Sequence, residues 1–349
     1  MIVAVWAPLL LPFLAVPLAR RVAEALSPRP AAWVLAGTAV TTAGATAVSL
    51  GLLAFTGLLR LPAVAALGHL APHRLADASA YPAVAAALLL VAASALLLRT
   101  GHHQLTDLRR ARSAADAGHT RSATGRLAAT GRTSPADLSG LADLSDRAEH
   151  ATAETTHAGA LTVLDDDRAD AFALPGPLAR PADPGRIVVT TGMLRALTGP
   201  ERAVLLAHEQ AHLGARHHLF LAATEYATVL HPALRPLRAP LGFQLERWAD
   251  EVAARVTGDR TLTARAVGRA ALAAAGAPRP DRPRLAPAAH SGPVPRRVAA
   301  LLTPPRPLHR TAGRTAAALA LAACLALTAS ASLEAAADLH DNVEAAQAH

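Results

Sequence analysis

Four long stretches without a charged residue constrain the fold of this chain more than any other feature of its sequence. They span approximately residues 2–19, 31–59, 81–98 and 315–333. A helix needs about 18 to 20 consecutive apolar residues to cross the hydrocarbon core of a bilayer. Charged residues make up 17% of the chain, below the roughly 25% of an average soluble domain. We therefore predict a mainly α-helical, multi-pass integral protein of the cell membrane, with about four transmembrane helices in contact with the lipid bilayer.

The positions of the arginines predict how these helices are oriented. All 34 basic residues are arginine, and they follow the first stretch at Arg20, follow the third at Arg99 and precede the fourth at Arg314. Because loops with an excess of arginine stay in the cytoplasm, we expect residues 20–30 and 99–314 there and both termini outside. The pI of about 11.1 does not indicate direct nucleic acid binding, since the sequence shows no basic helix or aromatic stacking platform.

Composition divides the chain into four predicted parts. Residues 1–99 form a membrane domain with three spans. Residues 100–157 are rich in small and polar side chains and are expected to be a flexible cytoplasmic linker, with a short helix near 136–155. Residues 158–311 form a more polar domain, and residues 312–349 contain the last span and a short external tail.

The polar domain shows alternating strand and helix patterns. Strands are expected at residues 160–164, 171–174 and 186–190. A capping-box pattern at Thr198 and Glu201 starts a helix that ends near Arg216. Residues 217–241 are apolar but interrupted by charges and prolines, which predicts a helix pair that is buried or lies at the membrane surface. Further helices are expected at residues 243–257, stopped by Gly258, and at 261–275.

One of these helices contains the pattern H-E-x-x-H, formed by His208, Glu209 and His212. Residues four apart lie on one face of a helix, so both imidazoles can bind one metal ion, and Glu209 can reach the attacking water. The apolar residues 203–207 indicate that this helix is partly buried, where two imidazoles without a partner would be costly. The pattern is typical of zinc-dependent peptidases. A surface helix with unrelated histidines is the simpler alternative.

The third ligand determines the class of metal site. Glu246 gives a His-His-Glu set with a fourth position left open, and Asp250, one turn later, can support a ligand histidine. Glu225 and Glu251 are alternatives for the ligand. His218 has the spacing of the third histidine in a different class of protease. That class also requires a glycine three residues after the second histidine and a later methionine turn, and this chain has neither.

Several motifs occur together in a characteristic order. They are Ala171-Phe-Ala-Leu-Pro-Gly176, Ile187-Val-Val-Thr-Thr-Gly192, Leu205-Leu-Ala-His-Glu-Gln-Ala-His212, Arg216-His217 and Glu246-x-x-x-Asp250. This set resembles the BlaR/MecR-type antirepressor metallopeptidases, membrane proteins whose cytoplasmic zinc domain inactivates a transcriptional repressor. The same order occurs in the related HtpX-type and CAAX-prenyl-type membrane proteases. About 16 residues follow the last span, so the external penicillin-binding sensor domain of the β-lactam antirepressors is not expected.

The resemblance implies a cytoplasmic α+β catalytic domain of the zincin type, in the gluzincin class, with a small sheet. It implies that His208, His212 and Glu246 bind Zn²⁺. It further implies that Glu209 is the catalytic base and that Asp250 takes the supporting position. The strand at Phe172, Ala173 and Leu174 resembles the edge strand to which an extended substrate adds by main-chain hydrogen bonds.

Two further residues are candidates for contacts with the oxyanion or the substrate, namely Arg216 and His217. His217 lies five residues after His212, which is roughly 140° around a helix. We therefore do not expect His217 to bind the same metal ion.

These observations predict a membrane-bound zinc metalloendopeptidase that cleaves a protein or peptide substrate at the cytoplasmic face. A transcriptional repressor is the expected partner, in a signal-transduction role. The alternatives are an HtpX-like quality-control protease for membrane proteins and a non-catalytic, zinc-binding signalling scaffold. A scaffold has no need of Glu209, and a small-molecule transporter is disfavoured because no span contains a charged residue.

Overall fold

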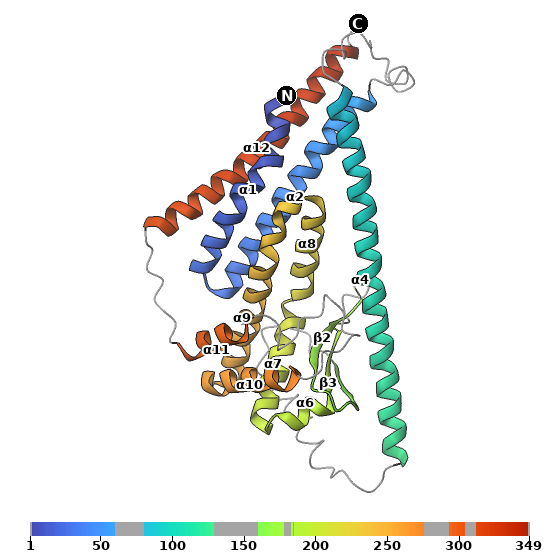
Figure 1. Ribbon diagram of the computed structural model, residues 1–349, viewed down its shortest axis with the longest axis vertical. Coiled ribbons are helices and arrows are strands. Elements are labelled where there is room, and N and C mark those ends of the chain that lie inside the picture. The colour runs from blue at the N-terminus through green and yellow to red at the C-terminus, as the bar shows by residue number, and fades with distance from the viewer. Residues whose placement is uncertain are drawn as a thin grey trace. The chain divides into compact units, whose positions relative to one another are not determined.

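The computed structural model describes residues 2–59, 80–128, 160–177, 183, 185–275, 293–303 and 312–347. Its helices and strands are α1 (Ile2–Ala25), α2 (Pro28–Leu58), α4 (Ala80–Ala128), β1 (Ala160–Leu164), β2 (Ala171–Pro175), β3 (Gly185–Thr190), α6 (Thr191–Ala196), α7 (Gly199–Gly214), α8 (His217–Leu230), the 3₁₀-helix η2 (Pro232–Leu237), α9 (Arg238–Thr257), α10 (Arg260–Ala274), α11 (Val294–Leu302) and α12 (Ala312–Gln347) (Figure 1). The described part of the chain is mostly helical with one small sheet, as expected.

The chain folds into two compact units. Unit 1 comprises Met1–Gly101, Ala223–Leu241 and Leu308–His349, and unit 2 comprises His102–Ala222 and Gly242–Pro307. Among the described residues, four helices are long and apolar enough to cross a membrane, over Trp6–Ala25, Pro28–Leu58, Tyr81–Asp116 and Gly313–Asp341. These helices fit a membrane protein, and they correspond to the four stretches that the sequence singled out. The predicted boundaries of the four parts of the chain stay predictions.

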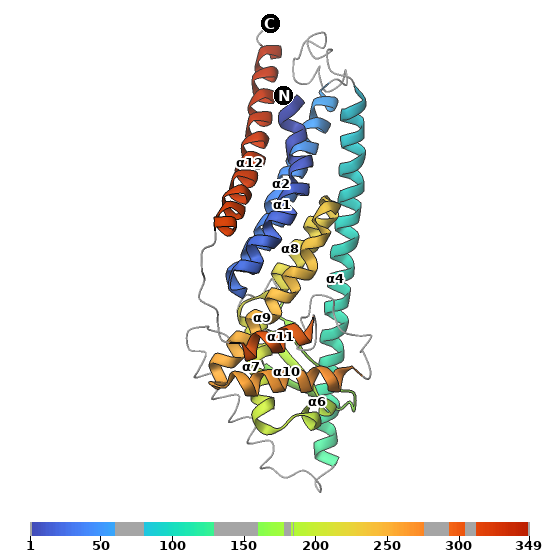
Figure 2. The same ribbon diagram turned by 60° about the vertical axis from the view of Figure 1, so that its left-hand side comes forward.

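Within unit 1, α1 packs against α2 and α12, and α1 and α2 run side by side (Figure 2). Pro12 has no backbone N–H to give to the carbonyl of Pro8, one turn earlier in α1. The hydroxyl of Thr46 in α2 lies 3.2 Å from that carbonyl and shares its proton between it and the carbonyl of Thr42, at 2.9 Å. An apolar environment strongly favours such compensation, because water is not available to bond the freed backbone group.

The segment 217–241 is a helix followed by a short 3₁₀ turn. Pro232 begins η2 and Pro236 lies within it, which ends α8 and lets the chain reverse before α9. At the turn, the Nε2 atom of His231 lies 3.0 Å from the carbonyl oxygen of Leu9, and its ring packs edge-on against Phe13. The tip of this hairpin, Ala223–Leu241, therefore belongs to unit 1.

Helix α4 continues to Ala128, across the first part of the segment 100–157 for which composition predicted a flexible linker. Leu108, Ala111 and Ala115 pack against the sheet of unit 2, and Arg186 of β3 pairs with Asp116 at 2.6 Å. These long-range contacts stabilise a helix that composition alone did not indicate. Residues 129–159, including the short helix predicted near 136–155, lie outside the described residues.

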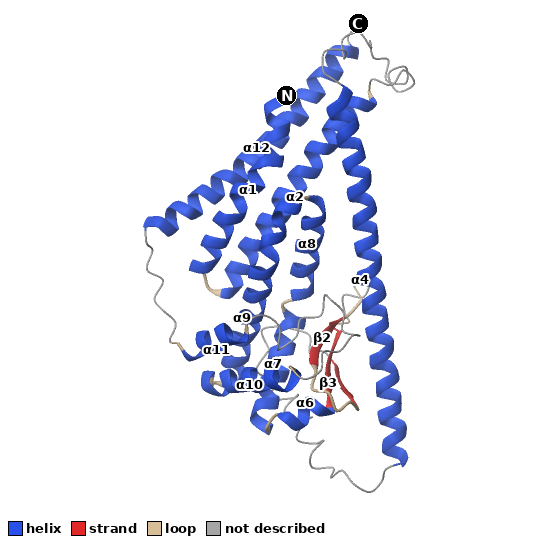
Figure 3. Cartoon of the chain, in the orientation of Figure 1, coloured by secondary structure: helices blue, strands red, loops and turns tan. Residues whose placement is uncertain are grey.

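The sheet has the strand order β1-β3-β2. β3 is parallel to β1 and antiparallel to β2, so β2 is an edge strand (Figure 3). All five residues of β2 are buried. Phe172 and Leu174 pack toward α4 on one face of the sheet, whereas Ala171 and Ala173 join a core with Leu205 of α7 on the other. The sheet therefore positions β2 beside the helix that carries the H-E-x-x-H pattern.

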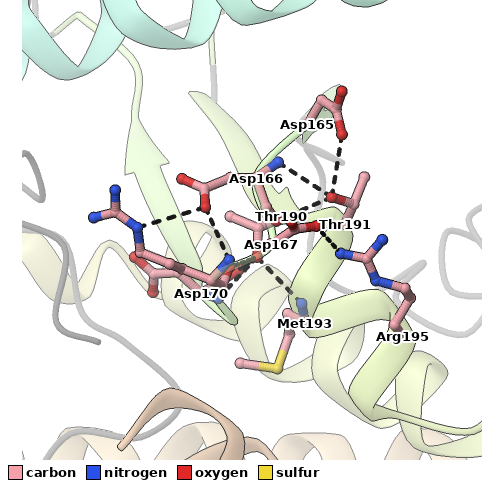
Figure 4. Close-up of polar contacts among 9 residues, drawn as sticks. Asp165, Asp166, Asp167, Asp170, Thr190, Thr191, Met193 and Arg195 are labelled. Atoms are coloured by element: carbon pink, nitrogen blue, oxygen red, sulfur yellow. Dashed lines mark hydrogen bonds and ion pairs between the residues drawn. The ribbon is translucent and has the colours of Figure 1, made fainter. Parts of the chain in front are cut away.

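An acidic turn after β1 is tied to the end of β3 (Figure 4). The hydroxyl of Thr190 accepts the N–H of Asp170 at 2.8 Å and that of Met193 at 3.2 Å, which caps α6. The hydroxyl of Thr191 donates to the carbonyl of Asp166 at 2.9 Å, and Arg195 pairs with Asp167. These contacts fix where β2 begins relative to β3.

Candidate metal centre

Helix α7 presents the two histidines of the pattern on one buried face. Thr198 and Glu201 form the predicted capping box, and Pro200 occupies the first turn, where its missing N–H costs nothing. Arg269 of α10 pairs with Glu201 at 3.0 Å. With the helix start fixed in this way, His208 and His212 lie one turn apart, and 2% and 1% of their surfaces are exposed.

Helix α9 brings Glu246 to the same point. The Nε2 atoms of His208 and His212 are 3.1 Å apart. Glu246 places Oε2 at 3.5 Å from His208 Nε2 and Oε1 at 3.6 Å from His212 Nε2. Ligand atoms about 2.0–2.2 Å from a tetrahedral zinc ion are themselves about 3.3–3.6 Å apart. The donor types, their burial and their separations therefore fit a zinc ion held by these three residues.

Glu209 follows His208 in α7 and is fully buried. A carboxylate in an apolar interior requires nearby positive charge. Arg297 supplies part of it, because Glu209 is among the carboxylates that raise the pKa of Arg297 against the lowering effect of burial. Glu209 is thus a buried carboxyl group next to the three clustered donors and is not one of them.

Behind His208 lies Asp250, whose Oδ1 is 3.0 Å from His208 Nδ1. Asp250 also accepts two hydrogen bonds from Arg297, at 2.8 Å from Nε and 2.6 Å from Nη2. A carboxylate that accepts a hydrogen bond from a ligand histidine fixes the orientation of the ring. It also keeps the ring proton on the nitrogen that does not bind the metal. Asp250 has the geometry for this role, and it is 2% exposed.

Behind His212 lies a different partner, His217, at the start of α8. The two Nδ1 atoms are 2.6 Å apart, and His217 is fully buried. The ring of His217 packs against Trp248, with the ring centroids 4.7 Å apart, and edge-on against Phe220. The two ligand histidines are therefore supported in different ways, one by a carboxylate and one by a second imidazole.

The imidazoles differ in their affinity for protons. Burial lowers the pKa of His208, but Asp250 and Glu246 outweigh it and raise the pKa to about 9. Burial, followed by the neighbouring His217 and His208, holds the pKa of His212 well below 6.5, and burial lowers the pKa of His217 to about 3. His212 and His217 are thus neutral at pH 7, whereas a metal ion must displace a proton from His208.

The structure brings together all five residues that the sequence placed in or next to the metal site, His208, Glu209, His212, Glu246 and Asp250. The alternative ligands are engaged elsewhere, since Glu225 pairs with Arg238 and Glu251 with Arg260. His218 is not one of the clustered donors among the described residues.

The remaining candidates take positions that the sequence could not fix. Arg216 is exposed and has a positive φ of 50° at the turn between α7 and α8. His217 faces the back of His212, a position that favours support of the ligand over contact with a substrate. Phe172, Ala173 and Leu174 have buried side chains, so a substrate beside β2 would meet their main chain.

Arg297 of α11 is a residue of this site that the sequence did not indicate. It is fully buried and touches both Asp250 and Glu246. The feature of the sequence that could have identified it is its position on the apolar side of a short helix, α11. A second arginine, Arg296, precedes it.

In a comparison with known protein families, the model of peptidase family M48 matches residues 141–235. This segment includes β1 to β3, α7 and α8. Neither a curated protein nor a solved structure matches the chain. The M48 peptidases are zinc metallopeptidases, so this match and the donor cluster support the same chemistry. Over the segment that carries His208, Glu209 and His212, the chain is similar to the M48 metallopeptidases.

Proposed function

We propose that the protein is a membrane-bound zinc metalloendopeptidase that hydrolyses peptide bonds at the cytoplasmic face. The observation that carries this proposal is the buried cluster of His208, His212 and Glu246 with Glu209 beside it. Three protein donors leave a position open for chemistry, whereas purely structural zinc sites have four protein ligands. Four long apolar helices support a membrane location, and the arginines at their ends support the cytoplasmic side.

Each residue of the site has a separate role in the proposed reaction. His208, His212 and Glu246 would hold zinc, which when bound polarises a carbonyl and makes water more acidic. Glu209 is the general base that accepts a proton from the attacking water, and it then returns the proton to the leaving amine. Asp250 and His217 keep the two histidine rings in place from behind. The buried surroundings exclude bulk water from these charges.

The edge strand β2 is the proposed support for the substrate. In the described part of the chain its neighbour in the sheet is β3, on one side, and its side chains are buried on both faces. An extended peptide can add to such an edge through main-chain hydrogen bonds, which bind many sequences with similar strength. Selection among substrates would then depend on residues outside β2.

We further propose that the reaction is regulatory and that its substrate is a cytoplasmic transcriptional repressor. The support is the order of motifs shared with the antirepressor metallopeptidases, from the strand at Ala171 to Asp250. The M48 match supports the peptidase activity and carries no information about the substrate.

The first experiment separates catalysis from metal binding. The full chain is purified in detergent as wild type, Glu209→Gln and Gln210→Ala, where Gln210 is a control next to Glu209 on the same helix. Zinc content is measured, and cleavage of unfolded casein is followed by mass spectrometry. We expect equal zinc in all three proteins and cleavage by the wild type and the control alone. Undiminished cleavage by Glu209→Gln would contradict the role of Glu209 as base.

The second experiment identifies the substrate class. Cells expressing the wild type or Glu209→Gln are compared for new protein N-termini that depend on Glu209. A repressor hypothesis predicts new termini in a DNA-binding regulator. New termini confined to membrane proteins would overturn it and leave a quality-control protease.

A further inference from the structure

One guanidinium group contacts two acidic residues of the candidate metal centre at once. Arg297 lies with Nη1 at 2.9 Å from Glu246 Oε2. Its Nε and Nη2 donate to the two oxygens of Asp250 at 2.8 Å and 2.6 Å. Arg297 is fully buried, so bulk water does not screen these contacts. A planar guanidinium has donors in a fixed fork, which orients its partners as well as attracting them.

The formal charges of the site show what this arginine does for a metal ion. Glu209, Glu246 and Asp250 are buried carboxylates with three negative charges. A divalent metal ion and Arg297 carry three positive charges, so the loaded site is formally neutral. Without Arg297, the loaded site keeps one uncompensated negative charge in an apolar interior, where such a charge is costly. In the metal-free site, His208 lies against both Asp250 and Glu246, but without Arg297 these carboxylates lose the donors that hold them in a fixed arrangement.

The position of Arg297 depends on how α11 is attached to its neighbours. Arg260, at the start of α10, donates to the carbonyl oxygens of Leu301 and Ala300 at 3.0 Å and 3.1 Å. The same arginine pairs with Glu251 of α9. Leu301 packs in a core with residues of α9 and α10. Helix α11 is therefore fixed to the helix that carries Glu246 by contacts that do not involve the metal-binding atoms.

We propose that Arg297 is a positioning residue of the metal centre. It holds Glu246 and Asp250 in the arrangement that binds zinc and balances their charge. The inference rests on the proposed zinc site, and it goes beyond it because it assigns a role to α11, which lies outside the segment similar to the M48 peptidases. The fork geometry is essential to this role, so a lysine at the same place should replace it only in part.

The test uses the full chain in detergent with Arg297→Met, Arg297→Lys and two controls, Arg296→Met and Arg296→Lys. Arg296 precedes Arg297 on α11 but stacks on the ring of Phe243, 4.6 Å from its centroid. Zinc affinity is measured by competition with a chromophoric chelator, and ligand geometry by the visible spectrum of the cobalt-substituted protein. We expect affinity to fall about 10- to 100-fold for Arg297→Met and less for Arg297→Lys. The cobalt spectrum should change in both, and both controls should match the wild type.

The outcomes separate this inference from the proposed function. A wild type that binds no zinc would overturn the metallopeptidase proposal itself. A wild type that binds zinc, together with an Arg297→Lys protein of equal affinity and equal cobalt spectrum, would overturn only the role of Arg297. Because Arg297→Met can fail to fold, the lysine variant decides the question in that case. Recovery of zinc affinity by added guanidinium in Arg297→Ala, with no effect of guanidinium on the affinity of Arg296→Ala, would support the role directly.

Discussion

The His212–His217 contact makes a prediction that separates metal binding from stability. His212 directs Nε2 to the triad and Nδ1 to His217, 2.6 Å away. A metal ion on Nε2 requires the proton of the neutral ring to lie on Nδ1. That N–H then donates to Nδ1 of His217, whose own proton must be on Nε2. The substitution His217→Phe removes the acceptor and keeps an aromatic ring against Trp248 and Phe220.

The expected magnitude follows from the cost of a buried, unsatisfied donor. Such a group costs about 1–3 kcal/mol, which corresponds to a loss of roughly 5- to 150-fold in zinc affinity. The metal-free protein avoids this cost, because an unoccupied His212 can move its proton to Nε2. The thermal stability of the metal-free His217→Phe protein should therefore equal or exceed that of the wild type, since an apolar ring replaces a buried imidazole.

The assay is a zinc competition titration at pH 7.5, paired with thermal unfolding of the zinc-free protein. Phe220→Leu is the matched control, because it alters the packing around His217 without removing the acceptor. An affinity unchanged in His217→Phe would refute the tautomer argument. A large loss of stability in the zinc-free protein would show instead that His217 acts through packing.

Three further predictions concern other parts of the chain. Burial raises the pKa of Glu201, but bonds with Thr198 and Arg269 lower it below 4.5. Glu201→Gln can keep the capping box but loses the ion pair with Arg269, so it should cost about 0.5–1 kcal/mol at neutral pH. In acid-unfolding curves this difference should disappear as the pH falls through the lowered pKa of Glu201. Thr46→Val removes the donor to the Pro8 carbonyl and should lower stability in detergent by about 0.6–1.7 kcal/mol, measured by thermal unfolding. Removal of zinc by a chelator should abolish cleavage, and added zinc should restore it.

The residues that lie together at the candidate metal centre could be selected from the sequence because they are local to two helices. His208, Glu209 and His212 share one helix, and Glu246 and Asp250 share another, so helical periodicity alone places each group on a face. For His217, the same periodicity predicted only that it does not bind the same metal ion, and it did not indicate the contact with His212. Helix α7 ends at Gly214, and Arg216 adopts a positive φ, so the angle around a continuous helix no longer applies.

Features that depend on long-range packing could not be predicted in this way. Arg297 reaches Asp250 from 47 residues later in the chain, and nothing in the local pattern of α11 indicates its partners. The extension of α4 to Ala128 depends on Ala111 and Ala115 packing against the strands. The strands themselves were predictable, because short apolar runs bounded by turns identify them, whereas the order β1-β3-β2 arises from their pairing.

The hairpin tip Ala223–Leu241 interrupts unit 2 in the sequence, and its ends lie inside the helices α8 and α9. The chain thus passes between the units within regular helices, with no loop at either point. One proteolytic cut near the tip cannot release an intact catalytic fragment, because Glu246 and His212 would then lie on different pieces. Recombination that exchanges domains at a single junction faces the same obstacle. A fragment that keeps the whole donor cluster without the apolar hairpin would therefore need a new connection between residues 222 and 242.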